Sequence, residues 1–67
     1  MVGKFILRQP TLAILNPERT GIAVPAGAFI EIVLAPLEGA KLVDVLWHGR
    51  AIFTFCRDIA TRANQVP

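Results

Sequence analysis

The side chains of this sequence with the greatest chemical potential are His48, Cys56 and Asp58, which have the residue types of a base, a nucleophile and an orienting acid. Nucleophilic catalysis requires these groups within hydrogen-bond reach of one another. His48 falls in a predicted turn, whereas Cys56 lies at the far end of the strand that follows it, and each strand residue adds about 3.3 Å. The two side chains therefore cannot meet within one subunit. We interpret Cys56 as a small buried apolar residue.

Metal and phosphate chemistry lack the ligands that they require. The chain has one histidine and one cysteine, whereas zinc sites use three or four protein ligands. Its glycines form neither a Gly-x-Gly-x-x-Gly nor a Gly-Lys-Ser/Thr motif. We therefore expect no metal, no cofactor and no catalytic residue, and we assign His48 to a turn, where its tolerance of positive φ is useful.

A tight hairpin is the clearest structural signal. His48 and Gly49 separate two runs of strand-forming residues, Lys41–Trp47 and Arg50–Cys56, which is typical of a two-residue turn. The turn fixes the register of the two strands. It pairs Trp47 with Arg50, Leu46 with Ala51, Val45 with Ile52, Asp44 with Phe53, Val43 with Thr54, and Leu42 with Phe55.

Both faces of this hairpin are largely apolar. One carries Val43, Val45, Trp47, Ile52 and Thr54, and the other carries Leu42, Asp44, Leu46, Ala51, Phe53 and Phe55. The pattern leaves open which face is the core. A hairpin with two apolar faces must be covered on both sides, by its own core and by another part of the chain or another molecule. We expect Leu42, Asp44, Leu46, Phe53 and Phe55 to form an interface.

Size and composition also favour association. A domain of 67 residues buries only about 60% of the surface that its unfolded chain exposes, and a lone cysteine cannot form an internal disulfide. Hydrophobic residues make up 54% of the chain and charged residues 18%, below the usual share of about 25%. A homo-oligomer explains these values. Asp44, set among apolar residues, is then either functional or paired with a cation such as Lys41, Arg50 or one from a partner chain.

A nucleic-acid interface is the main alternative for a binding site. Trp47, His48, Arg50 and Arg57 combine an aromatic ring with cationic groups. The net charge is only +2, however, and the basic residues are dispersed. A cross-strand cation–π pair between Trp47 and Arg50 is the simpler interpretation.

The rest of the chain reads as short extended pieces with a helical end. Charged residues interrupt every apolar run before the roughly 20 residues that a spanning helix needs, and no signal peptide is recognisable. We therefore expect a cytoplasmic protein that does not enter a membrane. The predicted extended pieces are 4–8, 11–15, a short strand-like piece at 21–24, and 28–34. The hairpin follows, then a helical or 3₁₀ turn within 57–62 capped by Asp58, and residues 64–67 form either a last short strand or a frayed end.

The order and spacing of these turns resemble the SH3-like small β-barrel. The sequence Val-x-Val-x-Trp-x-Gly at 43–49, followed by Phe55 and Asp58, is similar to small uncharacterised bacterial barrel proteins. The resemblance implies one all-β domain over residues 1–67, with about five strands and one short helical or 3₁₀ turn near its C-terminus. The aromatic residues with which SH3 domains bind proline-rich peptides have no counterpart.

Taken together, these patterns predict a noncatalytic module for protein interaction or assembly that self-associates through an apolar hairpin face. Two alternatives remain open. One is a small barrel that binds nucleic acid, and the other is an enzyme whose active site forms between subunits around Asp44 and His48.

Overall fold

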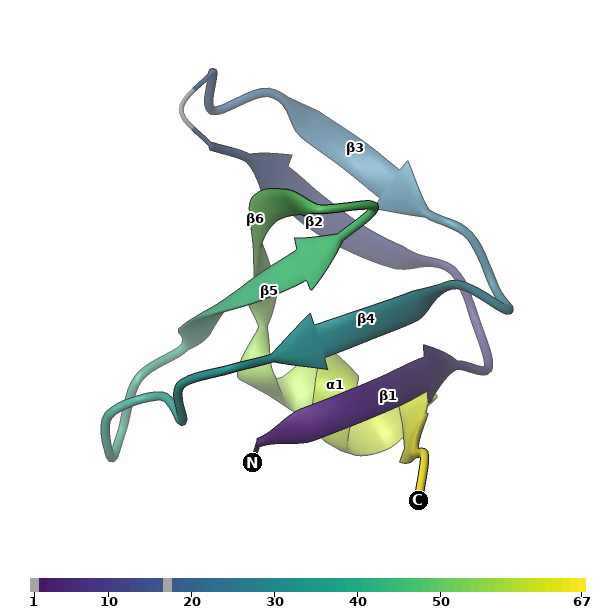
Figure 1. Ribbon diagram of the computed structural model, residues 1–67. Coiled ribbons are helices and arrows are strands. Elements are labelled where there is room, and N and C mark those ends of the chain that lie inside the picture. Colours follow the sequence, from purple (N-terminus) through teal and green to yellow (C-terminus); the bar gives the residue numbers. More distant parts are fainter. Residues whose placement is uncertain (1, 17) are drawn as a thin grey trace.

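The computed structural model describes residues 2–16 and 18–67, which form one curled antiparallel sheet and a short helix (Figure 1). The strands are β1 (Gly3–Leu7), β2 (Thr11–Leu15), β3 (Gly21–Val24), β4 (Phe29–Ile32), β5 (Leu42–Trp47), β6 (Arg50–Phe55) and β7 (Ala63–Gln65), and the helix is α1 (Cys56–Arg62). The order in the sheet is β3-β2-β6-β5-β4-β1-β7. Within residues 2–16 and 18–67, no helix has the length and apolar character needed to cross a membrane.

The β5–β6 hairpin has the predicted register. All six cross-strand pairs, from Trp47 with Arg50 to Leu42 with Phe55, are confirmed. His48 and Gly49 have φ values of 53° and 72°, and positive φ at both central residues defines the turn whose twist matches that of the strands.

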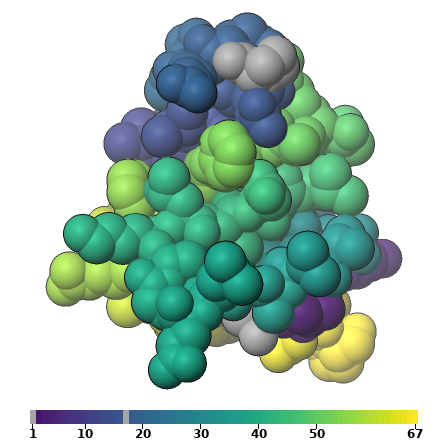
Figure 2. All heavy atoms as spheres, turned by 90° about the vertical axis from the view of Figure 1, so that its left-hand side faces the viewer, coloured from purple at the N-terminus to yellow at the C-terminus, as the bar shows by residue number. Residues whose placement is uncertain are grey.

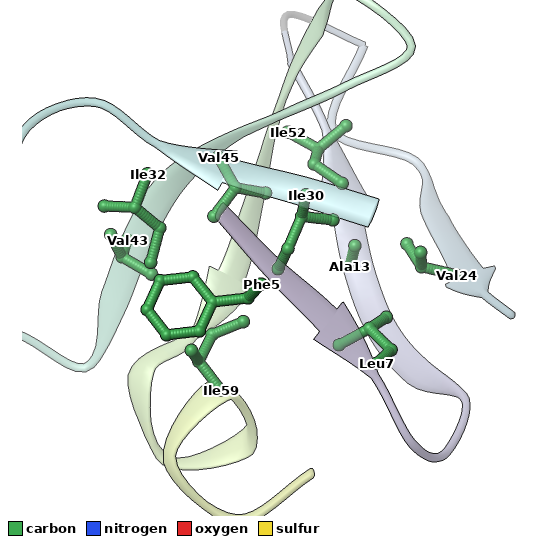
Figure 3. Close-up of a cluster of buried hydrophobic side chains, with 10 residues drawn as sticks. All are labelled: Phe5, Leu7, Ala13, Val24, Ile30, Ile32, Val43, Val45, Ile52 and Ile59. Carbon is green, nitrogen blue, oxygen red and sulfur yellow. The ribbon is translucent and has the colours of Figure 1, made fainter. Parts of the chain in front are cut away.

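The core lies against the hairpin face that carries Val43, Val45 and Ile52, which answers the question that the sequence leaves open. These side chains are at most 3% exposed. The other members of the core come from β1, β2, β3, β4 and α1: Phe5, Leu7, Ala13, Val24, Ile30, Ile32 and Ile59. Figure 3 shows Ile59 of α1 below the ring of Phe5, so the helix covers one end of the curled sheet.

The count of about five strands, which the SH3-like resemblance implies, is wrong, since the described part of the chain contains seven. Pro10 has no N–H to donate to a ladder, and the arm before residue 16 divides there into two strands with different partners. β1 pairs with β4 and β7, whereas β2 pairs with β3 and β6. Gly21–Val24 is a full strand of the same sheet.

The predicted helical segment is correct, but the predicted cap is wrong. α1 starts at Cys56, its N-cap residue is Phe55, and no side chain caps it by a hydrogen bond. Asp58 lies in the first turn instead, 4.0 Å from Nε of Arg62. There its negative charge complements the helix dipole.

Candidate interaction surface

The second face of the hairpin points away from the core. Leu42, Leu46 and Phe55 are 39%, 37% and 38% exposed, and Phe53 is half-buried. Asp44 is exposed and makes no ion pair within 4.0 Å among the described residues. Within one subunit Asp44 is therefore not paired with Lys41 or Arg50, and its pairing with a cation of a partner chain stays a prediction. All five residues of the predicted interface lie on this outer face.

Strand β2 extends the apolar surface, which the sequence does not predict. Ile14 pairs with Phe53, and Leu12, two residues earlier on the same side of β2, is 55% exposed. Alternation within 11–15 indicates such a face, but the β2–β6 pairing joins segments far apart in the sequence. We define the outer apolar face as Leu12, Ile14, Leu42, Leu46, Phe53 and Phe55.

The segment that joins β4 to β5 continues this surface. Val33, Leu34 and Leu37 are 64%, 82% and 85% exposed. In Figure 2 the teal atoms from the end of β4 to β5 lie at the front of the molecule. Two hollows, of about 160 Å³ and 400 Å³, lie between this segment and β5, and both are lined by Leu34 and Asp44.

The predicted binding residues are only partly brought together. Arg50 lies opposite Trp47 as predicted, but its guanidinium forms an ion pair with Glu18. The ring of Trp47 instead contacts His48, with centroids 4.8 Å apart and planes inclined by 48°. Arg57 is in α1, at the other end of the hairpin. These four residues therefore do not line one groove.

Another hollow lies beside the tip of the hairpin. It measures about 420 Å³ and is lined by Phe29, Leu46, His48 and an opposed pair of charges, Lys4 and Glu31. Lys4 and Glu31 are direct partners in the β1–β4 register. Within the described part of the chain they are not within 4.0 Å of each other as an ion pair.

The residues of the catalytic hypothesis stay apart. Cys56 is half-buried and packs against the core at the start of α1, whereas His48 is exposed at the hairpin tip. Over residues 2–16 and 18–67, no group of three or more His, Cys, Asp or Glu side chains is arranged to hold a metal ion. The described surface therefore presents apolar side chains and single charged groups to a partner.

Comparison of the chain with protein-family models, curated proteins and solved structures found no match. The structure establishes a small, mostly β domain with a barrel-like curl. Any function has to be argued from its surface.

Proposed function

We propose that this protein is a noncatalytic, SH3-like interaction module that associates with a second copy of itself through the outer apolar face. The observation that carries the proposal is the gathering of six apolar side chains on adjacent strands β2, β6 and β5. Single exposed apolar residues are ordinary, but a contiguous patch on a small domain is typical of an interface.

Charge complementarity favours a second copy as the occupant. Asp44 lies among the apolar residues of the face. Lys41 and Arg57 line a hollow together with Phe55, which belongs to that face. A two-fold axis places the same patch of each subunit against its copy. With the axis between these groups, Asp44 of one subunit faces Lys41 or Arg57 of the other.

The test compares two exposed apolar positions on different parts of the surface. Phe55→Glu places a charge in the outer apolar face, whereas Ala26→Glu places one in the exposed turn between β3 and β4. Light scattering at micromolar concentration should give an oligomer for the native chain and for Ala26→Glu, and a monomer for Phe55→Glu. Equal masses for the two variants would contradict the proposal.

The nucleic-acid alternative has weaker support. Arg50 is engaged by Glu18, and Arg57 lies at the opposite end of the hairpin from Trp47. Phosphate contacts make binding strengthen as salt is lowered. Retention on single-stranded DNA at low salt that is lost in Arg50→Ala would favour this alternative over self-association alone.

A further inference from the structure

On one side of β5, only some of the backbone N–H and C=O groups have a hydrogen-bond partner. The N–H of Cys56 donates to the carbonyl oxygen of Lys41 at 2.9 Å. Hydrogen-bonded and non-hydrogen-bonded pairs alternate along an antiparallel ladder, so Val43 and Val45 are the residues that bond to β6. Leu42, Asp44 and Leu46 therefore direct their N–H and C=O groups away from β6, toward β4.

Only one of these three residues is paired there. Leu46 pairs with Glu31, and this is the single β4–β5 pair. Strand β4 ends at Ile32, and the chain turns away before Val33 comes opposite Asp44. Among the described residues, the N–H and C=O groups of Leu42 and Asp44 have no backbone partner on this side. The result is a short open edge inside the sheet.

An apolar groove follows this open edge. The hollow of about 160 Å³ is lined by Val33, Leu34, Asp44 and Leu46, and that of about 400 Å³ by Leu34, Leu37, Leu42 and Asp44. Leu34 and Leu37 are more than four-fifths exposed, so the wall opposite β5 is itself apolar and uncovered.

The charged side chains that line the groove are both negative. Asp44 lines both hollows and Glu31 lines the smaller one. No lysine or arginine is among the described residues that line either hollow, and neither carboxylate has a cation within 4.0 Å in the described part of the chain. The groove therefore complements an occupant that is apolar with positive charges.

We propose that this groove binds an extended peptide segment of another protein, in which apolar residues alternate with lysine or arginine, as an added strand beside β5. An extended peptide supplies the donors and acceptors that Leu42 and Asp44 lack, and its alternate side chains enter the hollows. Its basic side chains face Asp44 and Glu31. This activity goes beyond self-association, because it uses the backbone edge of β5 and the segment after β4. Leu42, Asp44 and Leu46 border both surfaces, so the peptide and a second copy compete for these residues.

The decisive probe is a short fluorescein-labelled peptide of alternating valine and lysine, with its binding followed by anisotropy. A strand pairs through one edge, so only alternate peptide N–H groups face β5. N-methylation of one alternate set should weaken binding by about tenfold or more, the loss expected for two hydrogen bonds. N-methylation of the other set should leave binding unchanged. Equal binding of the two methylated peptides, or no binding of the parent peptide, would overturn the proposal.

Protein variants locate the site and separate it from the oligomer interface. Asp44→Lys should weaken binding of the valine–lysine peptide about tenfold, and Glu18→Lys, the same charge reversal in the turn between β2 and β3, should not. The peptide should still bind to Phe55→Glu, even if that variant is a monomer. Loss of peptide binding in Phe55→Glu would contradict a peptide occupant. So would a native chain whose β5 edge is covered by a second copy, shown by a dimer that Leu34→Asp converts to a monomer.

Discussion

Two buried hydroxyl groups are the least expected residues of the core. Thr11 and Thr54 are 1% and 2% exposed, and their Oγ1 atoms have no hydrogen-bond partner in the described part of the chain. A buried polar group without a partner lowers stability, because it loses its bonds to water on folding. The core therefore contains two sites at which an apolar residue of similar shape fits better.

Thr54→Val should stabilise the protein by about 1 kcal/mol, because it removes an unpaired buried hydroxyl. Urea unfolding followed by tryptophan fluorescence measures the change. Thr61→Val is the control, since the Thr61 hydroxyl is exposed and donates to the carbonyl oxygen of Arg57 at 2.9 Å. A loss of stability in Thr54→Val would mean that this hydroxyl is paired in solution.

His48 is the residue on which the hairpin turn depends. Its φ of 53° lies in the left-handed region, which costs a β-branched residue about 1–2 kcal/mol. His48→Val should lower the free energy of unfolding by about that amount, whereas His48→Asn should preserve it. Similar stability for the two variants in urea would show that the turn does not impose this conformation.

Single residues could be predicted from the sequence where their role is local. His48 and Gly49 specify their turn, and the turn specifies Trp47 opposite Arg50. The ion pair of Arg50 with Glu18 could not be predicted, because it joins the hairpin to a turn far away in the chain. The cap at Asp58 is wrong because α1 starts at Cys56.

At the scale of elements, the hairpin shows why register is easier to predict than burial. A two-residue turn fixes every cross-strand pair, but Val43 and Leu42 are both apolar, so the strand pattern does not distinguish inside from outside. The choice is made by Phe5, Ile30 and Ile59, which pack on one face only. Those contacts depend on pairing between strands that are far apart in the sequence.

The two faces should respond differently to truncation. Ile52 is fully buried, so Ile52→Ala should cost about 2–5 kcal/mol through lost burial and a cavity. Ile14 is half-buried on the outer apolar face, and Ile14→Ala should cost clearly less in a monomeric Phe55→Glu background. Equal losses in urea unfolding would contradict the assignment of inside and outside.

The end of β4 is an element that the sequence predicts too long. The run 28–34 is rich in β-branched residues, yet the strand stops at Ile32, and Pro36 has no N–H to donate to a ladder. The early end opens the seam between β4 and β5. The candidate peptide groove thus lies where the sequence favours a longer strand but β4 has already ended.

For the whole molecule, the sheet curls without joining its end strands. β3 and β7 lie at the two ends of the strand order and are not paired with each other in the described residues. The β1–β7 pairing is extended at both ends, by hydrogen bonds from the N–H of Val66 to the oxygen of Lys4 at 2.8 Å and from the N–H of Arg8 to the oxygen of Arg62 at 2.7 Å. A small core in an open sheet is stabilised when its outer face is covered.

Association of the native state should make stability depend on protein concentration. Whatever binds the folded chain alone raises its melting temperature by mass action. The Tm of the native chain should rise as its concentration is raised from micromolar to higher values, whereas that of Phe55→Glu should stay constant. A Tm independent of concentration in both proteins would show that association contributes nothing to stability.

The mass of the native chain in solution tests the central claim most directly. Sedimentation equilibrium at micromolar concentration, with no partner added, should report a particle heavier than the 7.3 kDa chain, because the outer apolar face is covered by a second copy. A mass of 7.3 kDa that does not change as the concentration is raised would contradict it.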